Sequence, residues 1–391
     1  MTIVDRWILP DGIEEILPPE AGRIEHLRRE ILDEFKLWGY ELVIPPMAEF
    51  LESLLTGVGH DLDLLTFKLT DQLSGRTMGL SADNTQQVAR MDAHSIQQEG
   101  TARYCYCSPV LHTKPASLHS GRSPIQIGAE LYGFRGLNSD VEIVNLMLTV
   151  LSRLGVKNIT LDLGHVSIYR AVADSIGLPD HLELQLYDLL RRKALPELDE
   201  FLTAQVAQYP ELNRIAALAP LSGSRTVLEK AEELFADLGD AVTNALNRLN
   251  TIADSVAENF PEVNLHFDLS ELKDYNYHTG LVFSAFVPGL GQALAKGGRY
   301  DATGEVFGRA RPATGFSTDL KALAKLTQLN GQSDTTVFAP ASTPMAVMAA
   351  QRAKGIPVVQ GLSGDDTASS LGCNHQLVEQ GGQWQVVALE N

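Results

Sequence analysis

The sequence has little cysteine, no long apolar run and a shortage of positive charge, and each lack excludes a class of protein. Its 391 residues include 3 cysteines, an odd number that implies no disulfide framework and fits a reducing cytoplasm. No stretch of about 18 apolar residues occurs, so we expect no membrane span, and residues 1–6 do not look like the start of a signal peptide. A net charge of −18 makes nucleic acid an unfavourable partner, because basic residues that neutralise phosphates supply most of that affinity.

Signature motifs for nucleotides and metals are also missing. Neither Gly-x-x-x-x-Gly-Lys-Ser/Thr nor His-Glu-x-x-His occurs, and 289–291 is only an incomplete dinucleotide fingerprint within an apparent hairpin. Cys105 and Cys107 alternate with tyrosines, which places both sulfurs on one face of a strand. A metal site needs more ligands at suitable spacing. We therefore predict packed cysteines, no metal and no cofactor.

What is present is the composition of a globular protein of two or three domains. Apolar residues make up 44% and charged residues 20% of the chain, which is ordinary for a soluble protein. Helical periodicity dominates from about 166 to 258 and predicts a helical insertion between two halves of a sheet. Elsewhere the patterns predict helices over 19–38 and 139–155, a helix that starts within 84–91, a hairpin over 64–80, and strands over 40–44, 103–110, 124–133, 159–163, 263–268, 281–286 and 292–296.

The end of the chain is predicted to form a second, smaller domain. A polar, turn-rich segment at 330–334 indicates a linker. The tail over 335–391 predicts an α/β unit with a strand at 336–338, a helix at 345–354, a strand at 358–359 and a hairpin that turns at Gly381-Gly382. We therefore predict an α+β protein with a core over 1–325 and a small C-terminal domain.

The strand predicted over 124–133 carries two polar residues in an apolar run. Gln126 and Glu130 are four residues apart, so strand alternation places both side chains on one face. Buried polar groups need partners, and an amide with a carboxylate suits an imidazole and an ammonium. Hydrogen bonding within the sheet explains the same pattern equally well.

Other polar positions also allow a structural explanation. Asp83 precedes a predicted helix and is a good N-cap. His278 taken alone is more typical of a satisfied core histidine. The stretch Gly297–Asp301, taken alone, indicates a tight turn that needs positive φ.

Three stretches together resemble the catalytic core of histidyl-tRNA synthetase, a class II aminoacyl-tRNA synthetase. They are Ile125–Glu130, Tyr277–Gly280, and Gly297–Asp301 followed by Pro312–Phe316. The helix, strand and proline of 19–46 look like motif 1, which forms the dimer interface in that family. The resemblance covers roughly residues 8 to 325 and implies a class II synthetase-like antiparallel sheet flanked by helices.

The resemblance also implies a set of histidine-binding residues. By analogy, Gln126 contacts the α-amino end of the ligand and Glu130 its imidazole, while Asp83 and Thr85 hold the α-ammonium. Tyr277 lines the imidazole pocket. Two positions depart from the family: His278 replaces a tyrosine, and Lys273 replaces the catalytic arginine, which is not an equivalent exchange at a two-point contact. The expected histidine-binding residues are Asp83, Thr85, Gln126, Glu130, Lys273, Tyr277 and His278.

The groups that would hold ATP in that family are mostly lost. In motif 2 an arginine has become His112 and an acid has become Lys114; in motif 3 a glycine has become Asp319 and an arginine Ala322. Each charged hydrogen bond is worth roughly 1.5–3 kcal/mol. We therefore expect weak ATP binding, no adenylation and no catalytic residues.

A chain of this kind resembles the regulatory subunit of ATP phosphoribosyltransferase, the first enzyme of histidine biosynthesis. Segments 7–12, 71–76 and 162–166 also look like that family. The resemblance implies a homodimer within a hetero-oligomer, with a short-form catalytic subunit as partner and L-histidine as the feedback signal. Two alternatives stay open: a divergent aminoacyl-adenylate-forming enzyme, and a stand-alone histidine-binding protein with another partner.

Overall fold

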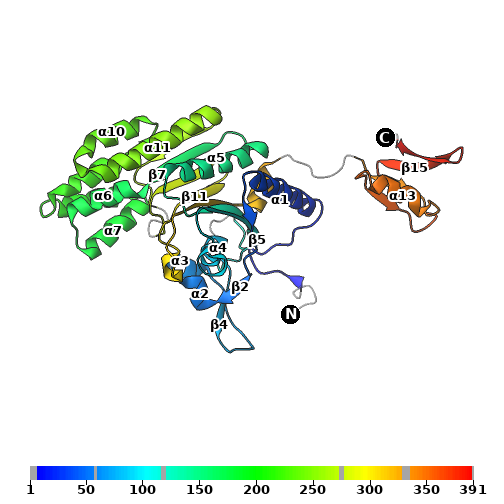
Figure 1. Cartoon of the computed structure of the whole chain (residues 1–391), viewed down its shortest axis with the longest axis horizontal. Helices are drawn as coiled ribbons and strands as arrows, with labels where there is room; N and C mark the ends of the chain where they lie inside the picture. Colours follow the sequence, from blue (N-terminus) through cyan, green and yellow to red (C-terminus); the bar gives the residue numbers. More distant parts are fainter. Residues whose placement is uncertain (1–6, 57–59, 116–119, 273–276, 328–334, 390–391) are drawn as a thin grey trace. The chain divides into compact units, whose positions relative to one another are not determined.

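The computed structural model describes residues 7–56, 60–115, 120–272, 277–327 and 335–389. Contacts divide the chain into two compact units, residues 1–328 and 329–391 (Figure 1). No helix among the described residues is long and apolar enough to cross a membrane.

The first unit is built on a nine-stranded sheet. Most neighbouring strands are antiparallel, and only the pairs β1–β5 and β7–β9 are parallel. The antiparallel sheet predicted from the sequence is therefore present. In spatial order its strands are β1 (Glu41–Leu42), β5 (Ala102–Pro109), β6 (Ile125–Tyr132), β12 (Ala313–Asp319), β11 (Ala295–Arg299), β10 (Leu281–Phe286), β7 (Thr160–His165), β9 (Asn264–Asp268) and β8 (Ser222–Gly223).

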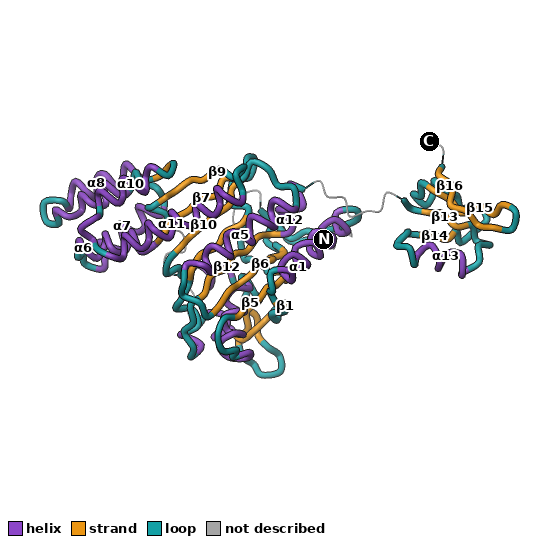
Figure 2. The backbone as a smooth tube through the Cα atoms, turned by 45° about the horizontal axis from the view of Figure 1, so that its top comes forward, coloured by secondary structure: helices purple, strands orange, loops and turns teal. Residues whose placement is uncertain are grey.

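Three long helices and one short helix, among the described residues, cover one face of this sheet. Figure 2 shows them lying across the strands, and each contacts at least one strand directly. Ile127, Ala129 and Leu131 of β6 are buried toward this side, so Gln126 and Glu130 point to the opposite face. The covering helices are α1 (Glu20–Leu37), α5 (Leu137–Arg153), α11 (Asp240–Asn259) and α12 (Leu320–Leu326).

The periodicity of residues 19–38 is confirmed by α1. Its apolar stripe of Ile24, Leu27, Ile31 and Phe35 is buried, which is the spacing of one helical face. The helix ends before Gly39, whose φ of +81° suits a chain that leaves a helix. The strand predicted over 40–44 is shorter than expected. Only its residues Glu41–Leu42 pair with a neighbouring strand, as β1 at the edge of the sheet.

The opposite face of the sheet carries a smaller layer. Its three-stranded sheet contains the hairpin predicted over 64–80, and Asp71 closes the turn by accepting from the Leu73 and Ser74 backbone N–H groups. The helix predicted from residue 84 packs on β5 and β6. The layer consists of β2 (Ala48–Phe50), α2 (Leu51–Leu55), α3 (His60–Leu65), β3 (Lys68–Thr70), β4 (Thr77–Leu80), α4 (Asn84–Arg90) and a π-helical turn (Met91–Ile96).

Residues 166–259 are helical apart from one short strand, as their periodicity predicts. Figure 1 shows this helical insertion in green at one end of the nine-stranded sheet. Strand β8 interrupts it and pairs with β9. The insertion contains α6 (Val166–Ile176), α7 (Asp180–Arg191), α8 (Leu195–Gln205), α9 (Asn213–Leu218), α10 (Thr226–Leu234), α11 and two 3₁₀ turns (Pro210–Leu212 and Ala236–Leu238).

The prediction of a turn at Gly297-Gly298 is wrong. Both glycines lie inside β11, and neither has a positive φ; the turn comes earlier, at Gly289 with φ +87°. A Cβ on Gly297 would lie 2.6 Å from the Phe283 ring, and one on Gly298 2.5 Å from the His278 ring. Glycine is needed here because backbone carbonyls and side chains of neighbouring segments lie too close to admit a Cβ, not because the chain turns. The strand predicted over 292–296 is displaced accordingly.

The second unit has a four-stranded sheet in the order β14-β13-β15-β16. One face is covered by α13 (Met345–Arg352), whose Met348 packs with Val337 and Leu377. Phe338 packs with Ala368 and Cys373 in a second cluster. The predicted strand, helix, strand and hairpin are all present, as β13 (Val337–Ala339), α13, β14 (Val358–Gln360), β15 (His375–Gln380) and β16 (Gln383–Ala388).

Candidate functional site

Gln126 lies on β6 and faces the start of α4. Its Nε2 donates to the Asp83 carboxylate at 2.9 Å and to the Ser317 hydroxyl at 3.3 Å. Its Oε1 accepts from the Asn84 backbone N–H at 2.7 Å. Asp83 also caps α4 by accepting from the Thr85 N–H at 2.9 Å, which confirms its prediction as an N-cap. The structure thus brings three of the predicted residues together.

Glu130 lies next to this group, with a relative exposure of 1%. Its Oε1 accepts from the Tyr106 hydroxyl at 3.1 Å, and its Oε2 accepts from the Tyr300 hydroxyl. The Thr85 hydroxyl lies 3.0 Å from that of Tyr106. Glu130 and Thr85 are therefore joined through one tyrosine.

Burial controls the protonation of this cluster. Removal from water raises the pKa of Glu130 to about 8, although the hydrogen bond from Tyr300 opposes the rise. Burial also raises the pKa of Tyr106 and of Tyr300 well above the ordinary tyrosine value, so both hydroxyls keep their protons and donate. An acid with a pKa near neutrality and two fixed donors can exchange its proton for an N–H from a ligand.

Aromatic rings form the wall beside Glu130. The ring of Tyr277 stacks on that of Tyr300 with 4.9 Å between centroids, and Tyr300 meets Tyr132 edge to face. The imidazole of His278 packs edge-on against Tyr277 at 5.2 Å. His278 is buried, so the structure places it directly behind the aromatic wall.

Two glycines leave space for the polar side chains of the cluster. A Cβ on Gly315, which pairs with Glu130 across β12 and β6, would overlap the Glu130 carboxylate. A Cβ on Gly128 would lie 2.6 Å from the Tyr106 hydroxyl oxygen. These positions admit no larger residue without displacing a member of the cluster.

The positions that correspond to ATP-binding residues are engaged in local structure. The His112 Nε2 lies 2.9 Å from the Ala82 carbonyl oxygen. Asp319 accepts from the Lys321 and Ile125 backbone N–H groups, each at 3.0 Å, and so caps α12 and fixes the start of β6. Lys114 is exposed to solvent.

Two cations near these positions are bound to the N-terminal segment. Arg122 donates to the carbonyl oxygens of Asp11 at 3.0 Å and His112 at 2.9 Å. The Lys321 Nζ donates to the Glu14 carboxylate and the Ser123 hydroxyl, each at 3.2 Å. Both cations already have protein acceptors.

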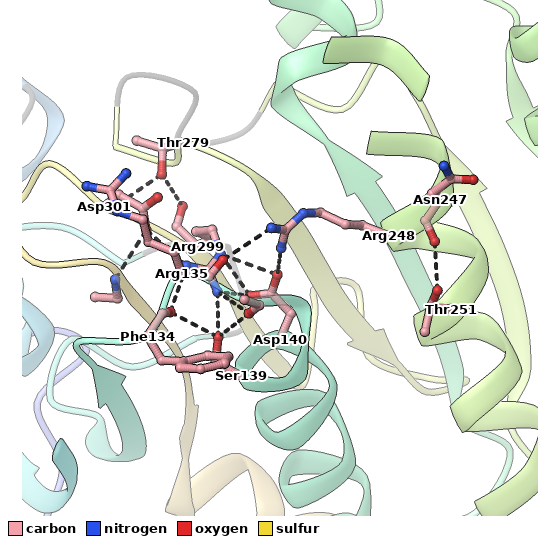
Figure 3. Close-up of polar contacts among 12 residues, drawn as sticks. Phe134, Arg135, Ser139, Asp140, Asn247, Arg248, Thr251, Thr279, Arg299 and Asp301 are labelled. Carbon is pink, nitrogen blue, oxygen red and sulfur yellow. Dashed lines mark hydrogen bonds and ion pairs between the residues drawn. The ribbon is translucent and has the colours of Figure 1, made fainter. Parts of the chain in front are cut away.

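A buried ion-pair network, shown in Figure 3, supports the strand that ends directly before Tyr300. Arg299 of β11 donates to Asp140 of α5 at 2.8 Å and to the Ser139 hydroxyl at 2.6 Å. Arg248 of α11 donates to the second Asp140 oxygen at 3.0 Å. The Arg299 carbonyl accepts from the Thr279 N–H at 2.7 Å. The network therefore holds β11 against the chain next to His278.

Sequence reasoning missed both tyrosines that donate to Glu130. Both belong to segments that the sequence singles out: Tyr300 lies within the Gly297–Asp301 motif, and Tyr106 alternates with the cysteines of β5. Their role depends on the register in which Gly128 faces Tyr106 and Gly315 faces Glu130. Glu130 also has more protein partners than an isolated buried acid would. Lys273 lies outside the described residues.

The cysteines and one cluster of acids lie apart from the predicted histidine-binding residues. Burial raises the pKa of Cys105 to about 12 and that of Cys107 to about 11, which disfavours the thiolate that metals bind. Asp162, Asp268 and Glu271 have carboxylate oxygens within 4.8 Å of one another. That cluster is next to a cavity of about 400 Å³ at β7 and β9, whose lining includes none of the predicted histidine-binding residues.

Comparisons with known proteins agree over both units. The family model described as histidyl-tRNA synthetase matches residues 12–323, and the model described as the ATP phosphoribosyltransferase subunit HisZ C-terminal domain matches residues 334–387. Proteins named ATP phosphoribosyltransferase regulatory subunit from Thioalkalivibrio sulfidiphilus and Pseudomonas aeruginosa are 53% and 54% identical, over 100% of both chains in each case.

Solved structures share the fold. One titled an ATP phosphoribosyltransferase regulatory subunit/histidyl-tRNA synthetase from Bacillus halodurans matches with a TM-score of 0.81 and 25% identity, covering 94% of this chain and 96% of that one. Histidyl-tRNA synthetase from Nostoc matches with a TM-score of 0.78 and 17% identity, covering 98% and 97%. The class II synthetase-like fold predicted from the sequence is confirmed.

Proposed function

The chain belongs to the ATP phosphoribosyltransferase regulatory subunit family, and from this premise we propose that it binds L-histidine and regulates a separate, short-form catalytic subunit. One observation carries the proposal. The side chains that would hold histidine converge and contact one another, whereas the positions that would hold ATP are used by local structure.

In the proposed complex, Glu130 receives an N–H of the histidine imidazole. The carboxylate already accepts from Tyr106 and Tyr300, and a third donor stabilises its ionised form. The ring of Tyr277, stacked on Tyr300, offers an apolar face to the imidazole. The aromatic wall thereby favours a flat heterocycle over an aliphatic side chain.

The ammonium of the ligand is proposed to bind at the start of α4. Asp83 supplies the negative charge, and Gln126 and Thr85 position it through the hydrogen bonds described above. Lys273 and His278 complete the proposed set, with His278 acting through its packing on Tyr277. In this arrangement Thr85 lies at the ammonium end of the ligand and Glu130 at the imidazole end, and Tyr106 is hydrogen-bonded to both.

We further propose that the chain has no catalytic turnover of its own. Motif 2 presents His112, hydrogen-bonded to backbone, where an ATP-binding arginine would be. Motif 3 presents the α12 cap Asp319 and then Ala322, which has no charge. Phosphoryl and adenylyl chemistry depends on fixed positive charge at the phosphates, and these positions do not supply it.

Self-association is proposed at the end of α1. Leu37, Leu42, Ile44 and Met47 are all at least half exposed, and they follow one another from the C-terminal end of α1 through edge strand β1 into the segment after it. Exposed apolar residues gathered in one region are typical of interfaces. This supports a homodimer as the unit that joins the catalytic subunit.

Calorimetry with the full chain tests the binding proposal. We expect saturable binding of L-histidine and no binding of ATP at the same concentration. Turnover of the short-form catalytic subunit should rise when the chain is added and fall again with histidine. ATP–pyrophosphate exchange dependent on histidine would show instead an adenylate-forming enzyme. Histidine binding without any effect on the catalytic subunit would show a sensor with another partner.

A further inference from the structure

Residues 277–280 lie between the sheet and the helical insertion. On the sheet side, the Thr279 N–H donates to the Arg299 carbonyl and the Asp301 N–H donates to the Thr279 hydroxyl. On the insertion side, α6 begins at this segment, because the Val166 N–H donates to the Gly280 carbonyl at 3.0 Å. The proposed pocket therefore shares its wall with the insertion.

Arg170, one turn into α6, reaches the same segment. Its Nη2 donates to the backbone carbonyl of His278 at 2.9 Å. That carbonyl belongs to the residue whose ring packs on Tyr277. A charged donor on a backbone acceptor is one of the stronger neutral–ion contacts, so the position of His278 is tied to α6.

Two more side chains of the insertion hold the chain that leads into residues 273–276. The Lys193 Nζ donates to Asp268 at 2.6 Å and to the Ser270 hydroxyl at 3.0 Å. The Tyr187 hydroxyl donates to the Leu272 carbonyl at 3.4 Å. Side chains of the insertion are thus hydrogen-bonded to the chain on both sides, at Asp268–Leu272 and at His278.

Lys193 lies just after α7, where its backbone ends the helix. Its φ is +52°, its N–H donates to the Leu190 carbonyl and the Ala194 N–H donates to the Leu189 carbonyl, which is the pattern of a left-handed helix cap. From this position the Lys193 ammonium contacts Asp268, which lies beside Asp162 and Glu271.

We propose that Arg170, Tyr187 and Lys193 are positioning residues through which the helical insertion sets the placement of Tyr277 and His278, and with it the affinity for histidine. The proposal rests on the proposed function of the same site. Since affinity and position are linked, histidine binding must in turn change the free energy of the insertion. The insertion is thereby the part of the first unit whose stability changes when histidine occupies the proposed pocket.

The test compares histidine affinities of full-length variants by calorimetry. Arg170→Met removes the guanidinium but keeps an unbranched aliphatic stem, and should weaken histidine binding about ten-fold, which corresponds to the loss of one charge-assisted hydrogen bond. Lys193→Met should weaken it about three-fold, because its contact is farther from Tyr277 and is partly exposed to solvent.

Two arginines of the insertion serve as matched controls. Arg192 is next to Lys193 but pairs with Asp188 and Glu197, and Arg225 pairs with Asp254. Arg192→Met and Arg225→Met should bind histidine like the wild type. Arg170→Lys, which retains a cationic donor, should recover part of the affinity, and it also provides a readout if Arg170→Met does not fold.

Hydrogen exchange gives an independent readout that a purely structural role would not change. Histidine should slow exchange in peptides from α6 and α7 of the wild type, and this protection should be lost in Arg170→Met. Variant affinities within two-fold of the wild type, with unchanged protection, would overturn the proposal while leaving the proposed function intact. A wild type that takes up no histidine would overturn both.

Discussion

The two halves of the class II site differ in what their polar side chains contact. In the amino-acid half, which is proposed to hold histidine, Asp83, Gln126 and Glu130 are bonded to side chains from other elements, and Asp83 in addition caps α4. In the ATP half, His112 and Asp319 are bonded to nearby backbone. The halves are direct neighbours, since Gln126 and Asp319 face each other across β6 and β12.

This difference shows how a binding site can be divided without changing the fold. The side chains proposed to hold histidine converge from separate elements and bond to one another. The contacts of His112 and Asp319 are to backbone groups, and they stabilise the surrounding elements. Replacement of the residues that correspond to ATP-binding groups therefore leaves the sheet unchanged, and substitutions can address each half separately.

The largest effect is expected from Glu130→Ala in the amino-acid half. It removes the acceptor for the imidazole and should weaken histidine binding by about 2–4 kcal/mol, because a desolvated donor is left unpaired. Histidine inhibition of the complex should be lost while activation of the catalytic subunit persists. Glu130→Gln, which retains an acceptor for Tyr106 and Tyr300, is the matched control for folding. Normal inhibition of the Glu130→Ala complex would show that the acid is only structural.

Gly315→Ala should have the next largest effect. Its added methyl group would overlap the Glu130 carboxylate, and overpacking of this kind costs typically 1–3 kcal/mol. Denaturant unfolding should show the loss of stability, and calorimetry should show weaker histidine binding. Gly291→Ala is the control, because no atom lies within 4 Å of the position of its Cβ. Equal effects of the two variants would contradict the packing seen around Glu130.

The raised pKa of Glu130 predicts a dependence of stability on pH. The folded protein holds this proton up to about pH 8, while the unfolded chain releases it near its ordinary pKa of about 4.3. The folded state binds more protons between those values, so the free energy of unfolding should fall as pH rises through them. The slope reaches about 1.4 kcal/mol per pH unit. Urea unfolding from pH 5 to 8 measures it, and Glu130→Gln should lack this component.

The smallest effect is expected from restoring one charge in the ATP half. His112→Arg should lose the contact with the Ala82 carbonyl and change stability by roughly 1 kcal/mol. It should not produce ATP binding, since Ala322 and Asp319 remain. Calorimetry with ATP and magnesium measures this. Micromolar ATP binding by the variant would mean that the ATP half is intact apart from a single residue.

Much of the fold follows from local pattern. The apolar stripe of α1 and the alternation of β6 each repeat with the period of one element, and Asp83 caps the helix that directly follows it. Such features depend on residues a few positions apart. The candidate residues of the amino-acid half were named from their match to a known motif, and their joint role in binding stays a prediction.

Other features depend on which strands become neighbours. The tyrosine donors to Glu130, the overlap of Gly315 with its carboxylate and the contacts of Arg170 all join residues more than twenty positions apart. The interpretation of Gly297-Gly298 as a turn failed for the same reason, because a glycine that relieves crowding between strands has no local signal.

The sequence by itself determined the elements, their apolar faces and the loss of the arginines that ATP binding requires, since these depend on residue type and spacing. Only the tertiary structure decided which polar groups face one another. It gave Glu130 two tyrosine partners, bonded Asp319 to the start of β6 and joined the helical insertion to the chain around His278. The physical reason is that a hydrogen bond needs two groups within about 3 Å, and sheet register and helix docking, which no local pattern contains, set that distance.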